Sequence, residues 1–419
     1  MRLIADLHLH SKYARATSPN MNLAGMSAGA KLKGIDIVAT GDFTHPVWFA
    51  ELKGKLKEGE AGTGLYNYNS VKFILQSEVS NIFSVNKIVK KIHLIILSPS
   101  LEIVAQINEA LAKKGNLEAD GRPIFGMTAA ETVELVMGIS HENVVIPAHV
   151  WTPFFSLFGS MSGFDTVEAC FGDQSKHIFA LETGLSSDPA MNWRLSKLDK
   201  YALVSNSDAH SPQKMGREAN VFDLKEANYF EMMKAIREKD LKKFPYTIEF
   251  FPEEGKYHYD GHRDCGVCLS PSESIKLNNI CPTCRRKLTI GVMHRVEALA
   301  DRPEGTHPAG MIPYKSIVPL HELIAKAIGK SEVSVKVNEL YSGLVPALGN
   351  EFAVLLDVDV GAIRRAAGDE VANAVQRMRE GKVSMKPGYD GVFGELVLDE
   401  KEAAKKGKGS MQGRLSEFV

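Results

Sequence analysis

The sequence predicts an α/β fold: a seven-stranded β/α barrel, then a small cysteine-rich module and a mostly helical C-terminal domain. Residues 1 to about 225 alternate short apolar runs with helix-like stretches, a pattern typical of parallel strands wrapped by helices. Nearly every run there ends on His, Asp or Glu, and barrels of this kind place their chemistry at the C-terminal strand ends. The 419 residues suffice for roughly two or three domains.

The barrel elements follow from hydrophobic patterning and from helix start signals. Two stretches, Ser100–Lys114 and Thr128–Gly138, are expected to be helices, and Thr128 with Glu131 fits a capping box. The expected strands are Arg2–Leu7, Ile35–Thr40, Lys72–Gln76, Lys91–Leu97, Asn143–Ala148, Ile178–Leu181 and Tyr201–Ser205.

The remainder divides by composition. We expect a charged helix and linker over residues 226–256, a cysteine module over 257–295 and an α-rich domain over 296–404. Helices are expected at Pro319–Ile328 and Val360–Glu380. Residues 405–419 are expected to be a flexible tail, because the stretch near Lys406–Ser410 alternates glycine and lysine.

Composition and charge exclude several classes of protein. The net charge of −1 gives no global positive field, so any attraction to nucleic acid must come from local patches. The first residues lack the apolar core of a signal peptide, and no apolar run approaches the ~20 residues of a membrane span. We therefore expect a cytoplasmic protein with no membrane partner.

Metal-binding residue types recur where the expected strands end. His8 and His10 lie two apart on one strand, so both imidazoles face the same side. A lone His at a strand end is more often a hydrogen-bonded rim residue, but its repetition at several ends predicts one polynuclear metal site. The candidate ligands are His8, His10, Asp42, His45, Glu78, His93, His149, Asp208 and His210.

Imidazole and carboxylate ligands suit zinc, manganese or iron, with magnesium as a further candidate. A bridging carboxylate such as Glu78 would hold two ions in the arrangement used for phosphate displacement. Two points stay open: whether Asp42, His45 or both bind metal, and whether Glu182 instead holds a ligand in place.

The motifs Asp6-Leu7-His8-Leu9-His10 and Ser207-Asp208-Ala209-His210, with Glu78 and His149, resemble those of the polymerase-and-histidinol-phosphatase (PHP) superfamily. This resemblance implies a distorted seven-stranded barrel with two or three divalent ions that hydrolyses phosphoesters. It also implies six catalytic residues: His8, His10, Glu78, His149, Asp208 and His210.

The sequence departs from the superfamily pattern in two places. Phe43 and Thr44 separate Asp42 from His45, where the superfamily commonly has Asp-His. The Ser-Asp-Gly that often follows the first motif is replaced by Ser11-Lys12-Tyr13-Ala14-Arg15. These departures leave the ligand set of one metal open.

Three further features are similar to the endonuclease Q family of DNA repair enzymes: residues 182–194, Ser211–Glu218 and the cysteine module. This resemblance implies that damaged DNA is the partner and that the protein works at the nucleoid. The expected activity is a nick 5′ to deaminated bases (uracil, hypoxanthine, xanthine) or abasic sites, leaving a 3′-hydroxyl and a 5′-phosphate.

The cysteine module contains two CxxC pairs, Cys265 with Cys268 and Cys281 with Cys284. Four thiolates at this spacing predict a closed, structural zinc site, and redox pairs are the alternative. The neighbouring Arg285 and Arg286 would suit contact with a phosphate backbone, although they could equally form a solvated charged surface.

Enzymes that act on a damaged base often extrude it from the stack, which requires aromatic and cationic groups near the site. Tyr13, Trp48, Trp151 and Phe154 lie after strand ends and are candidates for stacking on DNA, unless they are core residues. Arg194 and Arg217 are candidate phosphate clamps, with structural ion pairs as the alternative.

The tail carries Gln412, Leu415 and Phe418, spaced three apart. One helical turn would bring these side chains to one face, and the order resembles the sliding-clamp (PCNA) interaction peptide. Two other functions remain. A phosphatase for small phosphate esters would need neither the cysteine module nor the clamp motif. A clamp-associated DNA-binding adaptor without activity would be expected to lack metal ligands.

Overall fold

The computed structural model describes residues 1–398 and divides into two compact units. Unit 1 contains Met1–Pro252 and Gly291–Ser316, and unit 2 contains Glu253–Ile290 and residues 317–398. The expected clamp-binding residues Gln412, Leu415 and Phe418 lie outside the described residues. Within residues 1–398, no helix combines the length and apolar character needed to cross a membrane.

Strands form at all seven predicted positions of unit 1. They are β1 (Arg2–Asp6), β2 (Ile37–Ala39), β5 (Val71–Val85), β6 (Ile88–Ser98), β8 (Val144–Pro147), β9 (Ala180–Glu182) and β10 (Ala202–Val204). Six further strands join them: β3 (Lys57–Glu58), β4 (Tyr66–Tyr68), β7 (Ile124–Phe125), β11 (Ala219–Asp223), β12 (Tyr246–Glu249) and β15 (Tyr314–Ser316). The added strands extend the sheet beyond the predicted set.

The main sheet runs β15-β12-β11-β1-β2-β5, and β6 continues it from β5 to β8. Neighbours β1, β2 and β5 are parallel, as expected. Strands β9 and β10 pair with each other in parallel as a separate two-stranded sheet. A parallel bridge between Leu9 and Ala209 joins the His8-Leu9-His10 segment to the Asp208-Ala209-His210 segment.

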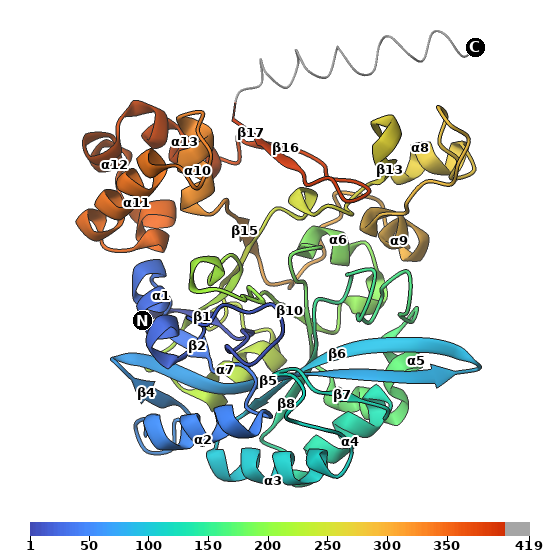
Figure 1. The fold of residues 1–419 in the computed structure, drawn as a ribbon, viewed down its shortest axis with the longest axis vertical. Helices are drawn as coiled ribbons and strands as arrows, with labels where there is room; N and C mark the ends of the chain where they lie inside the picture. Colours follow the sequence, from blue (N-terminus) through green and yellow to red (C-terminus); the bar gives the residue numbers. More distant parts are fainter. Residues whose placement is uncertain (399–419) are drawn as a thin grey trace. The chain divides into compact units, whose positions relative to one another are not determined.

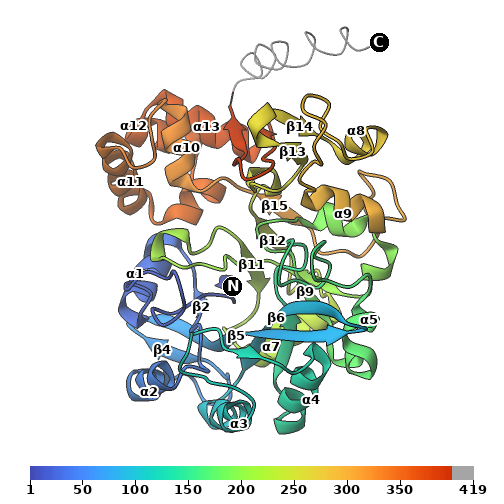
Figure 2. The same ribbon diagram turned by 45° about the vertical axis from the view of Figure 1, so that its right-hand side comes forward.

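The expected parallel pattern fails between β5 and β6, which form an antiparallel hairpin. Its turn is Asn86-Lys87, with φ of 51° and 68°, the left-handed backbone that two-residue hairpins prefer. No helix intervenes, so this pair breaks the β/α alternation. Figure 1 shows the hairpin as two long neighbouring arrows, and Figure 2 shows it again after rotation.

The helices of unit 1 are α1 (Leu23–Lys33), α2 (Pro46–Lys55), α3 (Leu101–Ala112), α4 (Ala129–Ile139), α5 (Val167–Phe171), α6 (Pro189–Trp193), α7 (Tyr229–Glu238) and α9 (Val292–Leu299). Ser100 caps α3 through its side chain. The predicted capping box of Thr128 and Glu131 begins α4. In Figures 1 and 2, α2, α3 and α4 lie along one side of the strands.

The segment 226–256 is more than the expected helix and linker. It contains α7 and also β12, which pairs antiparallel with β11 and parallel with β15. Residues 291–316 likewise return to unit 1. These strands were not predicted because β12 and β15 are short and their partners are distant along the chain.

Unit 2 holds the cysteine module and the helical region. Its elements are β13 (Asp260–His262), β14 (Val267–Leu269), α8 (Pro271–Lys276), α10 (Leu320–Ala327), α11 (Val335–Leu348), α12 (Val360–Ala367), α13 (Asp369–Arg379), β16 (Ser384–Lys386) and β17 (Glu395–Val397). The single helix expected over Val360–Glu380 is broken at Gly368, whose φ is 91°. Glycine adopts that conformation without the steric cost of a side chain.

Candidate metal centre

Four imidazoles surround the carboxylate of Glu78 in unit 1. Glu78 Oε1 lies 2.8 Å from His93 Nδ1 and 3.0 Å from His149 Nε2. Glu78 Oε2 lies 3.2 Å from His10 Nε2 and 3.7 Å from His8 Nε2. Asp208 Oδ1 completes the group at 3.1 Å from His10 Nε2. Each oxygen of Glu78 thus faces its own pair of imidazoles, as a bridging ligand requires.

Three overlapping ligand sets result: His8, His10 and Glu78; Glu78, His93 and His149; and His10, Asp208 and His210. Among residues 1–398, the buried atoms His8 Nε2, His10 Nε2 and Asp208 Oδ1 form no hydrogen bond of good geometry, although the last two lie 3.1 Å apart. Buried polar atoms normally have one, so their orphaned state fits divalent cations. Because an imidazole nitrogen has one lone pair, His10 can serve only one of the two sets it belongs to.

An unusual backbone conformation orients three side chains in and around the cluster. Asp42, His149 and Asp208 have φ of 43°, 31° and 47°, in the left-handed region that residues with side chains rarely adopt. Such conformations cost free energy and cluster at functional sites. All three follow strand ends, where the chain turns away from the sheet.

Buried acceptors fix the orientation of the ligands. Glu182 Oε1 lies 3.0 Å from His8 Nδ1, and Glu182 Oε2 accepts the backbone N–H of His149 at 2.7 Å. Asp6 accepts from the Ser207 hydroxyl at 2.6 Å, joining the first motif to the last. These contacts assign Glu182 to positioning, one of the two roles considered for it.

Burial and charge set the protonation of the cluster. Burial lowers the pKa of His93 to about 4, so its imidazole is neutral and can donate a lone pair. Burial would raise the pKa of Glu78, but the positive charge of Arg122 and the hydrogen bonds from His10 and His149 outweigh it and hold that pKa well below its ordinary value. Burial raises the pKa of Asp6 to about 6.

The structure corrects the roles expected for Asp42 and His45, since neither belongs to a ligand set among the described residues. Asp42 Oδ1 lies 2.9 Å from His10 Nδ1, and its Oδ2 accepts from the backbone and hydroxyl of Ser11. The His45 ring stacks on Tyr13 with centroids 4.4 Å apart. The two intervening residues, Phe43 and Thr44, are fully buried and occupy the start of this turn.

Arg122 is a site residue that the sequence analysis missed. Its Nη1 donates to Glu78 Oε2 at 2.9 Å. Arg122 lies between α3 and β7, in a segment without a metal-ligand motif, so no sequence signal marked it. Asp6 was also missed as a functional residue, although its place two residues before His8 was a usable signal.

The rim aromatics separate into core and surface. Trp48 is buried and donates its Nε1–H to Gly41 O, and Trp151 is buried and donates to Asn192 Oδ1. Both are therefore core residues, which corrects the stacking role expected for them. Tyr13 is half-buried and donates to Glu51. Phe154 remains 54% exposed and is free to contact a large ligand.

The two arginines expected to bind phosphate, Arg194 and Arg217, lie in different surroundings. Arg194 is buried and forms an ion pair of 2.6 Å with Glu297, which corrects its expected role as a phosphate clamp. Arg217 donates to the backbone oxygen of Ser207 and lines a pocket of about 530 Å³ beside the cluster. That pocket is lined by Ala16, Thr17, Ser18, His210, Ser211, Lys214 and Arg217.

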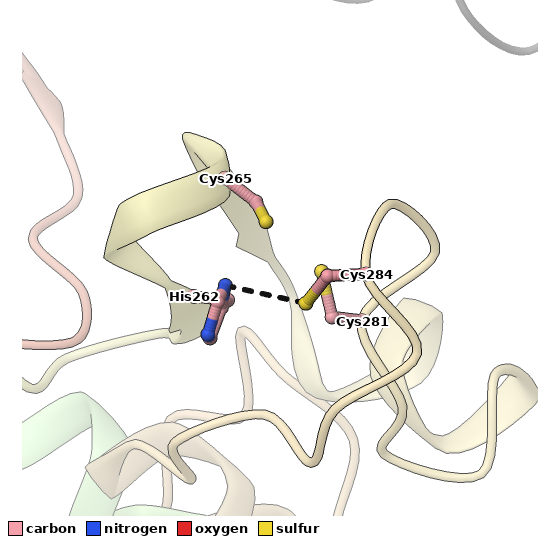
Figure 3. A group of neighbouring side chains, drawn as sticks. All are labelled: His262, Cys265, Cys281 and Cys284. Atoms are coloured by element: carbon pink, nitrogen blue, oxygen red, sulfur yellow. Dashed lines mark hydrogen bonds between the residues drawn. The ribbon is translucent and has the colours of Figure 1, made fainter.

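The cysteine module forms a ligand set that differs from the predicted one. His262, Cys265, Cys281 and Cys284 converge, as Figure 3 shows, with Cys284 Sγ 3.7 Å from His262 Nδ1. Cys268 is not in this set, which corrects the expected four-cysteine site. In the β13–β14 ladder, Cys268 faces Gly261 while His262 faces Val267, so the two side chains lie on opposite faces. The spacing His-x₂-Cys-x₂-Cys was the available signal for His262.

Nitrogen and sulfur ligands of this kind fit zinc. Burial would raise the pKa of Cys281, but the backbone N–H groups of Thr283 and Cys284 outweigh it and lower that pKa. A lowered pKa favours the thiolate that binds metal. Arg285 and Arg286 are exposed next to this set.

Two family profiles match the chain: the "PHP-associated" family over residues 193–241 and the "MJ0043 C-terminal domain" over residues 319–382. Among curated proteins, the uncharacterized protein YqxK of Bacillus subtilis is 28% identical, covering 94% of this chain and 99% of YqxK. The uncharacterized protein MJ0043 of Methanocaldococcus jannaschii is 31% identical over the matched region. That region covers 59% of this chain and only 31% of the length of MJ0043.

Two solved structures match nearly the whole chain. The lesion-specific endonuclease PfuEndoQ of Pyrococcus furiosus is 32% identical with a TM-score of 0.85, over 96% of each chain. A complex of endonuclease Q with a 27-mer duplex carrying an abasic lesion at the active site is 32% identical with a TM-score of 0.83. That match covers 96% of this chain and 98% of the other.

The fold, the shared carboxylate and the PHP-associated segment together define a metal-dependent phosphoesterase of the PHP superfamily. Within that superfamily, the family is shown by 32% sequence identity to two solved structures over 96% of this chain. The chain belongs to the endonuclease Q family.

Proposed function

We propose that this chain is a metal-dependent DNA repair endonuclease that nicks one strand 5′ to a damaged residue. The observation that carries the proposal is the bridging position of Glu78 between two pairs of imidazoles. It occurs in a chain that matches endonuclease Q over 96% of its length. Abasic sites and deaminated bases (uracil, hypoxanthine and xanthine) are the proposed lesions.

The residues assigned to two ions follow from the ligand sets. His8, His10 and Asp208 would hold one ion with Glu78 Oε2, and His93 and His149 would hold the other with Glu78 Oε1. His210, at the edge of the cluster, is the candidate for a third. Divalent cations supply Lewis acidity and charge neutralisation to phosphodiester hydrolysis.

The residues of the chain have separate tasks in this proposal. Glu182 and Asp42 hold the imidazoles of His8 and His10 from behind, which preserves the geometry of the cluster. Lys214 and Arg217 present positive charge in the pocket next to His210, where a DNA phosphate can bind. Phe154 would stack against DNA at the rim, because its exposed ring lies in the loop that follows His149.

Two further contacts belong to the proposal. We expect Arg285 and Arg286 of the zinc module to touch the DNA backbone, which would make binding depend on salt. We also expect Gln412, Leu415 and Phe418 to bind the sliding clamp. Deleting residues 412–419 should abolish retention on immobilised clamp and leave nicking of free DNA unchanged, and retention by the truncated chain would contradict the motif.

Duplexes with one uracil, hypoxanthine, xanthine or abasic residue test the main proposal. Nicking should occur at the phosphodiester 5′ of the lesion, require divalent metal, and disappear in His8→Ala and Asp208→Asn. The exposed His141→Ala is the matched control and should nick normally. Equal cleavage of undamaged duplex, or hydrolysis of small phosphomonoesters alone, would refute the proposal.

A further inference from the structure

Arg122 contacts the ligand cluster without being a metal-binding residue type. Its Nη1 donates to Glu78 Oε2 at 2.9 Å, on the oxygen that His10 Nε2 approaches to 3.2 Å. The guanidinium therefore occupies the space that a cation between these groups would share. In the described residues around the cluster, it is the fixed positive charge nearest to the bridging carboxylate.

The backbone on both sides of Arg122 is anchored. Gly121 N donates to Tyr13 O at 3.0 Å, and Ser80 N donates to Pro123 O at 2.9 Å. A Cβ on Gly121 would lie 2.5 Å from Asp42 Oδ2, so only glycine permits this approach. The guanidinium is thus positioned by fixed backbone next to the ligand cluster.

Metal binding removes the reason for the Arg122–Glu78 contact. Cations held by both oxygens of Glu78 would take up its negative charge and would repel a guanidinium beside them. Arginine cannot shed its proton to relieve this repulsion. Besides Asp208 and Asp120, whose charges also attract it, Arg122 can therefore take a further anion in the loaded site.

The position of Arg122 indicates which anion that is. The side chains of Arg122 and Asp208 each keep 27% of their surface exposed, while Glu78 and His10 have none, so both reach the open side of the cluster. A guanidinium presents forked donors that match phosphate oxygens. The phosphodiester to be cut is the anion that must enter from that side.

We propose that Arg122 is a catalytic residue that leaves Glu78 in the metal-loaded enzyme and binds the scissile phosphodiester. This inference rests on the proposed endonuclease function. The competing role is purely positional, in which Arg122 only holds Glu78 in place for the metals.

Binding to two uncleavable duplexes separates these roles. Both carry an abasic lesion. In one, a methylene group replaces the 3′ oxygen of the scissile linkage and the negative charge is kept. In the other, an uncharged methylphosphonate replaces the scissile phosphodiester. Affinity is measured by fluorescence anisotropy with metal-saturated full-length protein, and bound metal is counted by elemental analysis.

Arg122→Gln should bind the charged duplex about tenfold more weakly than wild type, because one charge-assisted contact is lost. On the methylphosphonate duplex it should match wild type, and its metal content should be unchanged. Arg122→Lys should recover part of the loss. The control is Arg302→Gln, which breaks the Asp199 ion pair of unit 1 and should affect neither duplex selectively.

Equal weakening on both duplexes, or a loss of bound metal that accounts for the weakening, would overturn the proposal in favour of a positional role. Failure of the proposed endonuclease function would give another result, which is seen with the wild-type protein. In that case wild-type protein would bind lesion and undamaged duplexes equally and nick neither, and the assignment of Arg122 to DNA would fall with it.

Discussion

Glu182 holds His8 by its Nδ1 at 3.0 Å, and its other oxygen accepts the backbone N–H of His149 at 2.7 Å. One carboxylate therefore orients residues of both ligand pairs around Glu78. The imidazole of His8 cannot rotate without breaking its contact with Glu182, and the backbone of His149 cannot shift without breaking the other. The spacing of the two proposed ions thus depends on a residue that binds neither of them.

Glu182→Gln should weaken metal binding while leaving the fold intact. The amide keeps the shape of the carboxylate but loses the charge that raises the basicity of the imidazole, and such changes typically cost about 10–100-fold in metal affinity. Competition with a chromophoric chelator measures the effect. Glu109→Gln, at an exposed position of α3, is the control. Unchanged affinity in Glu182→Gln would contradict the positioning role.

Phe154→Ala should weaken binding to lesion-containing duplex by about tenfold, since stacking of a base on an aromatic ring is worth roughly 1–3 kcal/mol. Thermal stability should change little, because 54% of the Phe154 side chain is already exposed. Phe230→Ala, at a 39% exposed position on α7, serves as control in the same anisotropy assay. Equal losses in both variants would argue against a specific contact by Phe154.

A buried carboxyl in unit 1 should make stability depend on pH. Glu249 accepts from the hydroxyls of Ser205 and Thr183, and burial raises its pKa to about 8. The ordinary value is 4.5, so between pH 4.5 and 8 the folded state retains a proton that the unfolded state has lost. Stability from this group is present below that window and is lost as pH rises through it.

Glu249→Gln should therefore reduce the fall in melting temperature between pH 5 and 8, as measured by differential scanning fluorimetry. The neutral amide has no proton to lose. Glu109→Gln again supplies the control, because that side chain is exposed. If Glu249→Gln and wild type show the same slope, the carboxyl of Glu249 is already ionised in the folded protein.

The zinc module offers a direct test of its ligands. Cys281→Ser should lose one equivalent of zinc per chain, because Cys281 is the fully buried member of the set. His262→Ala should lose more zinc than Cys268→Ser, whose thiol lies 3.9 Å from Pro387 O. The lone Cys170→Ala should keep its zinc. The reverse order for His262 and Cys268 would restore the four-cysteine site.

The predicted strands and most ligands were accessible from sequence because strand ends and periodicity are local properties. All seven strands form, and His8, His10, Glu78, His93 and His149 meet as the spacing implied. The antiparallel turn at Asn86-Lys87 was missed because long apolar runs do not reveal strand direction. Arg122 was missed because its role depends on a contact with Glu78, which is distant along the chain, whereas His262 was missed although its spacing to Cys265 was a local signal.

The remaining wrong predictions concern side chains that were expected to contact DNA but are buried. Trp48, Trp151 and Arg194 carry the right chemistry for DNA contact, yet each is enclosed and bonded within unit 1. A single sequence shows that a residue follows a strand, but not whether the next loop covers it. For this reason Trp151 is buried while Phe154, three residues further along the chain, is exposed.

The left-handed backbone at His149 and Asp208 has a consequence for how inactive forms of this protein are made. Alanine at either position removes the side chain but keeps a conformation that disfavours any Cβ, at about 1 kcal/mol or more. Glycine removes both the side chain and that penalty. His149→Gly and Asp208→Gly should therefore be inactive and should have higher melting temperatures than the corresponding alanine variants. The backbone conformation that positions these two ligands thus lowers the thermal stability of the protein.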